Sequence, residues 1–168
     1  MMQARDVLDV IDVLAEEGIT VILDGGWGID ALLGAQHRDH DDVDLVVLLD
    51  HIDAVVVTLE SVGFSMETDR RPTQLRFVDR SGRAVDLHLV RADEDGDLWQ
   101  EAAMPDGSDA RYPASEMTTG WVGGREVRCI GAALQVVHHS GYVPRSRDLH
   151  DLSLLQRQYG ISLPEGYR

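Results

Sequence analysis

The fold of this chain is decided at residues 19–27, Ile19-Thr20-Val21-Ile22-Leu23-Asp24-Gly25-Gly26-Trp27, where the sequence changes character twice. The β-branched run at 19–23 predicts a short buried strand. Two glycines end it, and residues 27–33 predict a short helix that Gly34 closes. Such a junction lets backbone approach a ligand closely, and the unpaired N–H groups of a helix start suit a phosphate. Taken alone, however, the glycine pair fits a tight turn better.

The rest of the chain keeps helices and strands interspersed. Apolar periodicity predicts helices at 3–17, 51–62, 131–140 and 147–158, and strands at 43–49, 64–67, 75–79, 83–90 and 126–130. Gly141 and Pro144 separate the last two helices, and Arg80-Ser81-Gly82 predicts a hairpin. We therefore expect an α+β (or α/β) fold, a mixed β-sheet flanked by helices with a small helical C-terminal segment. Composition shifts to solvated turn at 91–97, which suggests a core at 1–92 and a C-terminal segment at 93–168.

The charge of the chain excludes several functions. Thirty acids face fifteen bases, a net charge of −15, and every base is arginine. Without lysine, a Walker loop, a Schiff base and a protein kinase site are impossible, so His37-Arg38-Asp39 is no kinase catalytic loop. A large negative field repels nucleic acid and favours cationic substrates and divalent metal ions. The same charge could equally serve solubility alone.

Two features bear on the compartment. No apolar run approaches the roughly 18–20 residues of a membrane helix, and the N-terminus does not read as a secretory signal. Cys129 is the single cysteine. We therefore expect no membrane partner and a reducing, cytoplasmic environment.

Asp42-Val43-Asp44 begins the second predicted strand. Residues i and i+2 of a strand share a face, so these two carboxylates converge. Like charges at this separation repel, and a divalent cation between them removes the repulsion; oxygen ligands suit Mg²⁺. A solvated, acid-rich turn is the alternative interpretation of the same residues.

Asp86 is an acid in the middle of the apolar strand at 83–90. Burying it is costly unless it is paired or bound to metal, although an open sheet face would remove the cost. Period two places Asp86 and His88 on one face of that strand. Together with the glycine pair, Asp42 and Asp44, this acid completes the parts of a phosphoryl-transfer site, in which paired metal ions clamp the reacting oxygens and one acid accepts a proton.

Two stretches carry a resemblance to a known family: Gly25-Gly26-Trp27-Gly28-Ile29-Asp30-Ala31-Leu32-Leu33-Gly34 and Arg38-Asp39-His40-Asp41-Asp42-Val43-Asp44. They resemble the signature of antibiotic nucleotidyltransferases, and are similar to the lincosamide nucleotidyltransferases and the aminoglycoside 2″-adenylyltransferases. Val85-Asp86-Leu87-His88 resembles their later acidic strand. His139-Ser140-Gly141-Tyr142 and Asp148-Leu149-His150-Asp151 resemble a C-terminal segment of the lincosamide enzymes. The resemblance runs from about residue 20 to 155, with gaps at 50–80 and 95–125.

The resemblance implies a DNA-polymerase-β-like nucleotidyltransferase that moves a nucleoside monophosphate from a nucleoside triphosphate, ATP first, onto a hydroxyl of a small cationic antibiotic. Asp42 and Asp44 would bind Mg²⁺, two ions by expectation, and Asp86 would be the third carboxylate, as ligand or general base. Gly25 and Gly26 would hold the triphosphate through backbone N–H groups. Many members of the wider superfamily carry Ser at the position of Gly26, and because this chain lacks that hydroxyl, the contact would be through the backbone alone. Arg38 is a candidate triphosphate clamp, since its fork matches phosphate oxygens, or else a solvated loop arginine.

Other functions stay open at this stage. A toxin–antitoxin nucleotidyltransferase that modifies a protein or tRNA is the main alternative, followed by a nucleotide-binding protein without activity and by a glycosyltransferase that uses the Asp-x-Asp motif. Five histidines hint at zinc, but their spacing favours separately satisfied side chains. Both antibiotic classes carry amines, so charge does not choose between them. Resemblance to small members implies a homodimer, formed through apolar residues of the C-terminal helices: Ala132, Ala133, Val136, Val137, Leu149, Leu152 and Leu155.

Overall fold

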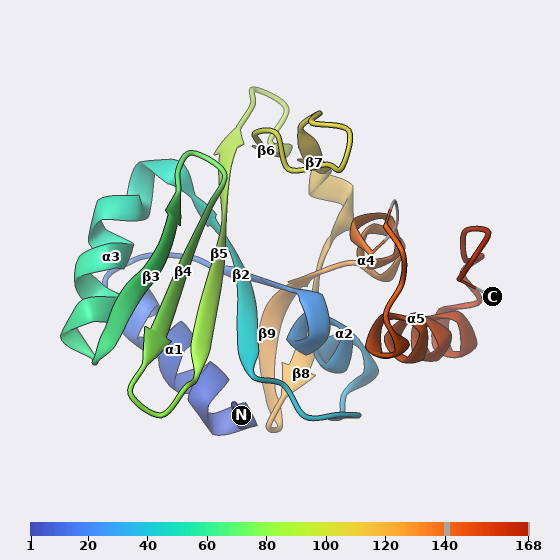
Figure 1. The fold of residues 1–168 in the computed structure, drawn as a ribbon, viewed down its shortest axis with the longest axis horizontal. Coiled ribbons are helices and arrows are strands. Elements are labelled where there is room, and N and C mark those ends of the chain that lie inside the picture. The colour runs from blue at the N-terminus through green and yellow to red at the C-terminus, as the bar shows by residue number, and fades with distance from the viewer. Residues whose placement is uncertain (140–141, 168) are drawn as a thin grey trace.

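A mixed β-sheet carries most of the residues singled out above. The computed structural model describes residues 1–139 and 142–167, so the expected separator Gly141 lies outside the described residues. The strands follow the order β3-β4-β5-β2-β1-β9-β8, with β6 and β7 attached beyond β5 (Figure 1). Their bounds are β1 Ile22–Asp24, β2 Asp42–Leu48, β3 Phe64–Arg70, β4 Gln74–Asp79, β5 Ala84–Ala92, β6 Leu98–Gln100, β7 Ala110–Tyr112, β8 Met117–Val122 and β9 Arg125–Ile130. The central strand β2 is parallel to β5 and antiparallel to β1.

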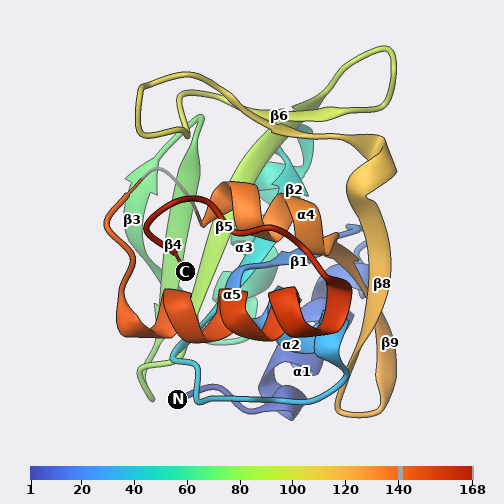
Figure 2. The same ribbon diagram turned by 90° about the vertical axis from the view of Figure 1, so that its right-hand side faces the viewer.

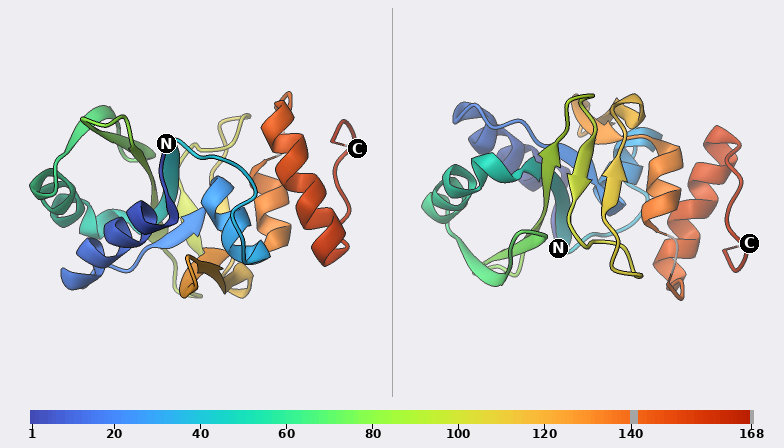
Figure 3. Two further views of the ribbon diagram at one scale, coloured as in Figure 1. Left: turned by 90° about the horizontal axis from the view of Figure 1, so that it is seen from below. Right: turned by 90° about the horizontal axis from the view of Figure 1, so that it is seen from above.

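The helices form two groups around this sheet. They are α1 Ala4–Glu16, α2 Gly25–Leu33, α3 Ile52–Ser61, α4 Ala132–His138 and α5 Ser146–Tyr159, with short 3₁₀ turns η1 Leu49–His51 and η2 Ala114–Glu116. Figure 3 shows α4 and α5 at the opposite end of the molecule from α3. In Figure 2, α5 lies in front of α2 and below α4, and it contacts both helices.

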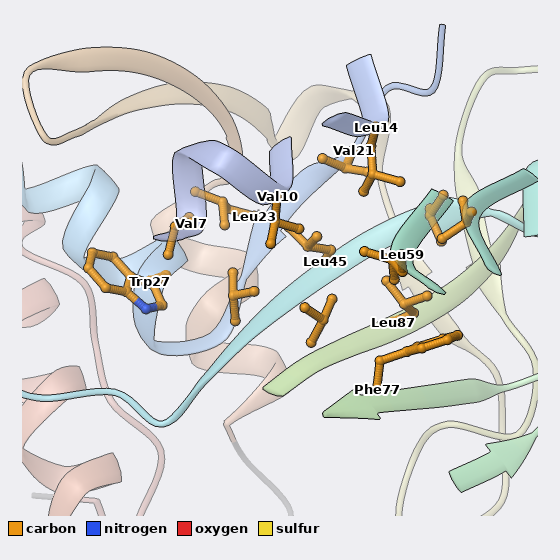
Figure 4. Packing of buried hydrophobic residues seen from close by; sticks show 14 of the residues in the cluster. Val7, Val10, Leu14, Val21, Leu23, Trp27, Leu45, Leu59, Phe77 and Leu87 are labelled. Carbon is orange, nitrogen blue, oxygen red and sulfur yellow. The ribbon is translucent and has the colours of Figure 1, made fainter. Parts of the chain in front are cut away.

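The main core lies between the sheet and the pair α1 and α3. Val10 of α1 and Leu59 of α3 belong to one buried cluster with Leu45 and Leu87 of the central strands (Figure 4). A separate cluster joins α2, α4 and α5, and it contains Val136 together with Ile29, Ala132, Leu152 and Leu155. Four residues expected to face a second copy of the chain are therefore buried within this one: Ala132, Val136, Leu152 and Leu155.

The predicted α+β class, with a mixed sheet and flanking helices, is confirmed. The boundaries at the glycine pair differ from those expected. The strand expected at 19–23 is observed at 22–24, where both β2 and β9 pair with it, and α2 begins at Gly25 because Asp24 caps it. The helix expected at 51–62 is preceded by a 3₁₀ turn.

Residues 98–130 contain three strands that the sequence pattern did not predict. β6 and β7 are only three residues long, and β8 is an edge strand that pairs with β9 alone. β8 and β9 belong to the sheet of the N-terminal part, so the sheet itself continues across residue 92. Within the described ranges, no helix has the length and apolar composition needed to cross a bilayer.

Gly120 of β8 lies directly against α2, and a side chain there would overlap the backbone at Ala31. We expect Gly120→Ala to destabilise the protein by about 1–3 kcal/mol, the usual range for overpacking. Thr119→Ala on the exposed part of the same strand is the control, with an expected change within about 0.5 kcal/mol. Urea unfolding measures both, and equal midpoints would show that β8 does not set the position of α2.

Candidate active site

Three aspartates lie side by side across the centre of the sheet. Asp24 of β1 is the register partner of Asp44 of β2, which in turn is the partner of Asp86 of β5. We call these three residues the acidic row. Register partners share a face of a sheet, so the three carboxylates project to one side. Asp42 shares that side because it is two residues before Asp44.

The opposite side of the same strands faces the main core. Val43 and Leu45 of β2 and Val85 and Leu87 of β5 are all fully buried there. This alternation confirms the period of two on which the sequence analysis relied, and it leaves the acids facing away from the core.

An open cleft of about 670 Å³ lies over the acidic face. The acidic row and Asp42 line it, together with Gly25 and Gly26 at the start of α2. The C-terminal part of the chain contributes further lining residues, among them Ala103, Met104, Pro105, His138 and Tyr142. The volume is within the range of about 300–1,000 Å³ that small-molecule sites occupy.

Arg76 of β4 lies at the end of the acidic row, because its register partner on β5 is Asp86. Its Nη1 donates to Oδ2 of Asp86 and lies 3.6 Å from Oδ2 of Asp42. Its Nε donates to Oε2 of Glu67 at 2.9 Å. The guanidinium therefore offsets part of the repulsion between the carboxylates.

Asp86 is the most deeply placed of the three acids predicted to act in the reaction, with 7% of its surface exposed. Its Oδ1 is buried and has no hydrogen-bond partner among the described residues. Burial and the charge of Asp44 raise the pKa of Asp86 to about 6, although the charge of Arg76 lowers it. A carboxyl group with this pKa can accept a proton near neutral pH.

His88 lies on the same face as Asp86, as expected, and its Nε2 is 3.2 Å from Oδ1 of Asp44. Burial disfavours the charged imidazole, but the hydrogen bond and charge of Asp44 outweigh it and raise the pKa of His88 to about 9. Gln100 acts in the other direction: its Nε2 donates to the carbonyl of Thr73 at 3.0 Å and lies 3.2 Å from Nδ1 of His88. A proton on Nδ1 would point at that amide N–H group.

Gly25 and Gly26 form the first turn of α2, not a turn that precedes the helix. Gly25 has a φ of 58°, and a Cβ there would overlap the carboxylate of Asp44. A Cβ at Gly26 would overlap the side chains of Arg38 and His40. The glycines therefore bring the helix start and the polar side chains of the cleft together. A larger residue at Gly26 would displace Arg38 and His40 before it met any ligand, which the sequence did not reveal.

Arg38 lines the cleft, but its guanidinium group already donates hydrogen bonds within the protein. Nε and Nη2 donate to Asp151 of α5, with a shortest distance of 2.7 Å, and Nη1 donates to the carbonyl of Asp39 at 3.1 Å. An arginine has five N–H donors, so two stay available for a ligand. Arg38 is thus neither a solvated loop residue nor an open clamp.

Histidines near the cleft contact separate partners, although Nε2 of His138 is buried without a hydrogen-bond partner among the described residues. His40 contacts Oδ2 of buried Asp30 at 2.5 Å and packs against the ring of Trp27. Nδ1 of His138 is 3.3 Å from Oδ2 of Asp24. Across residues 1–139 and 142–167, no three His, Cys, Asp or Glu side chains are grouped closely enough to hold a metal ion as they stand.

The acids near the cleft nevertheless fit Mg²⁺ by their chemistry. Carboxylate oxygens are the ligands Mg²⁺ prefers, and this ion is commonly held by one or two carboxylates plus substrate phosphates and waters, without a full protein cage. Oδ1 of Asp86, on the strand position next to Asp44, has no hydrogen-bond partner among the described residues and can serve as a metal ligand. The guanidinium of Arg76 already donates to Asp86 and lies 3.6 Å from Asp42, so a metal ion at these carboxylates would have to share them with this side chain.

Sequence reasoning missed Asp24, Arg76 and Gln100 as parts of the site. Asp24 stands at the break after the predicted strand, where the pattern assigns it no role, but it caps α2 and joins the acidic row. Arg76 lies in a strand that was correctly predicted, yet its position beside Asp86 depends on how two strands pair. Gln100 comes from one of the strands that the sequence did not show.

Comparisons with known proteins identify relatives of this chain. The family model for aminoglycoside-2″-adenylyltransferase matches residues 6–155. A lincosamide resistance protein of Staphylococcus haemolyticus is 28% identical over 152 residues, which cover 90% of this chain and 93% of that protein.

Solved structures point to the same fold. The crystal structure of lincosamide antibiotic adenylyltransferase LnuA with lincomycin bound aligns with a TM-score of 0.80 at 28% identity, covering 90% of this chain and 95% of that one. The structure of ANT(2″)-Ia in complex with adenylyl-2″-tobramycin aligns at 0.73 with 19% identity, covering 92% and 88%. With the family match over most of its length and an acidic cleft on a nucleotidyltransferase fold, this chain belongs to the aminoglycoside-2″-adenylyltransferase family of antibiotic nucleotidyltransferases.

Proposed function

We propose that this protein transfers the adenylyl group of ATP to a hydroxyl of a lincosamide or aminoglycoside antibiotic, with Mg²⁺, and so gives resistance. The observation that carries the proposal is the arrangement of Asp42, Asp44 and Asp86 on one face of β2 and β5, beside the start of α2 and under one cleft. Sequence relatives, which cover most of both chains, support the reaction type.

Each residue has a role in this reaction. Asp42 and Asp44 would hold Mg²⁺, two ions in this proposal, and the metal would supply charge stabilisation at the phosphates when bound. The acceptor oxygen bonds to the α-phosphorus, the bond to the pyrophosphate oxygen breaks, and Asp86 takes the hydroxyl proton. Backbone N–H groups at Gly25 and Gly26 would bind the triphosphate at the helix start. Arg38 would add its two remaining N–H groups while Asp151 holds it in place.

The C-terminal segment supplies the proposed acceptor side of the cleft. Ala103, Met104 and Pro105 form an apolar stretch in its lining, and Tyr142 adds an aromatic ring. Such a surface suits an acceptor that has an apolar part, which makes a lincosamide the first acceptor to test. The net charge of −15 favours the cationic form of either antibiotic class. A cytoplasmic location and a homodimer both stay predictions.

A panel of lincosamides and aminoglycosides, incubated with ATP or GTP and Mg²⁺, tests the proposal directly. Mass spectrometry should detect one added nucleotide on a lincosamide and released pyrophosphate. An added nucleotide on tRNA or protein in the same assay, with no change in any drug, would favour the toxin–antitoxin alternative instead.

Asp42→Asn and Asp44→Asn should each abolish detectable transfer, because a neutral amide is a poor Mg²⁺ ligand. Asp41→Asn is the matched control, since this neighbouring acid does not line the cleft. Circular dichroism should show that all three variants fold. Full activity in either cleft variant, or wild-type activity in excess EDTA, contradicts the metal assignment.

Asp86→Asn distinguishes a general base from a metal ligand. A positioned base contributes roughly 10²–10⁴-fold, so kcat should fall by about that factor while KM for ATP changes little. Initial rates at varied ATP and fixed acceptor measure both constants. If KM for ATP and the Mg²⁺ requirement rise together with the loss in kcat, Asp86 acts chiefly as a ligand.

A further inference from the structure

We propose that Arg76 is an internal cation that occupies the place of the metal ion in the metal-free protein, and that it has to withdraw toward Glu67 before the ion can bind. The inference rests on the proposed function, because it takes Asp42 and Asp86 as carboxylates of the metal site.

The position of Arg76 is the first argument. Its Nη1 donates to Oδ2 of Asp86 and lies 3.6 Å from Oδ2 of Asp42, so one nitrogen adjoins carboxylates from two different strands. A metal ion shared by Asp42 and Asp86 would bind the same two carboxylates that this guanidinium contacts. The guanidinium and a metal ion therefore compete for Asp86.

Electrostatics explains why a cation is needed there at all. The register places Asp24, Asp44 and Asp86 next to one another on three adjacent strands. Neighbouring like charges on a sheet destabilise it, and Asp86 is nearly buried. Arg76 compensates this charge on the β4 side of the row.

A second partner gives Arg76 a place to withdraw to. Nε already donates to Oε2 of Glu67 at 2.9 Å, and the Glu67 side chain is half exposed. The register of β3 and β4 shifts between Met66 and Thr68, so Glu67 is the extra residue of a bulge. Bulges re-aim side chains, and this one brings a carboxylate beside Arg76 from the edge strand β3, which lies on the far side of β4 from the acidic row.

Arg83 shows that this arrangement differs from an ordinary ion pair of the same sheet. It is as exposed as Arg76, 33% against 32%, and it has two acidic partners, Asp6 and Asp79, where Arg76 has three. Neither partner of Arg83 lines the cleft. Arg83 is therefore an arginine of matched exposure, paired with acids but with no carboxylate of the proposed metal site.

The test is Mn²⁺ binding to the full-length protein without substrate, measured by electron paramagnetic resonance of the unbound ion and repeated in competition with Mg²⁺. Arg76→Gln should bind Mn²⁺ about tenfold more tightly than wild type, since the ion no longer displaces a charge-assisted hydrogen bond. Its melting temperature should be lower without metal and should rise more when Mn²⁺ is added. Arg83→Gln should bind Mn²⁺ as wild type does.

Glu67→Gln is a second variant, and it keeps the inference testable if Arg76→Gln does not fold. Without Glu67 the withdrawn guanidinium loses its partner, so Mn²⁺ affinity should fall several-fold, opposite in sign to Arg76→Gln. Unchanged or weaker binding in Arg76→Gln, tighter binding in Glu67→Gln, or no binding in any protein overturns the inference. The transfer assay on wild type is separate, so it shows independently whether the proposed function stands.

Discussion

The acidic row is the constraint on which the rest of this structure depends. Asp24, Asp44 and Asp86 occupy adjacent positions on β1, β2 and β5, where their charges oppose one another. Each acid is compensated differently. Asp24 accepts from the backbone N–H of Gly25 and contacts His138, Asp44 contacts His88, and Asp86 pairs with Arg76. Three polar side chains that line the cleft, His88, Tyr112 and His138, contact Asp24 or Asp44.

That compensation also joins the two parts of the chain. Tyr112 of β7 donates to Oε1 of Gln100 at 3.0 Å, and Gln100 in turn contacts His88 beside Asp44. Asp151 of α5 holds Arg38 against the start of α2. Residues beyond position 92 are thus hydrogen-bonded to the side chains that surround the acids. A change in the C-terminal segment can therefore alter the geometry around the acidic row.

The lining of the cleft comes from two kinds of structure. β2 and β5 are anchored by fully buried residues such as Leu45 and Leu87, which hold the acids in position. The stretch that carries Met104 and Pro105 links two short strands outside the main sheet order. Loops tolerate sequence variation better than the strands they connect, so this part of the lining can vary without moving the acids.

The sequence by itself determined much of the local structure. Alternation determined which strand faces bear Asp42, Asp44 and Asp86. The glycines marked the junction between β1 and α2, although the pattern predicts a helix from Trp27 and α2 begins at Gly25. The sequence also carried enough family signature to indicate the reaction type. Only the tertiary structure decided that Asp24 joins the acids, that Arg76 lies between Asp86 and Glu67, and that Arg38 is held by a residue 113 positions away. Periodicity reports which side of a strand a residue is on, but not which strand lies next to it, because order and register are set by packing across the whole sheet.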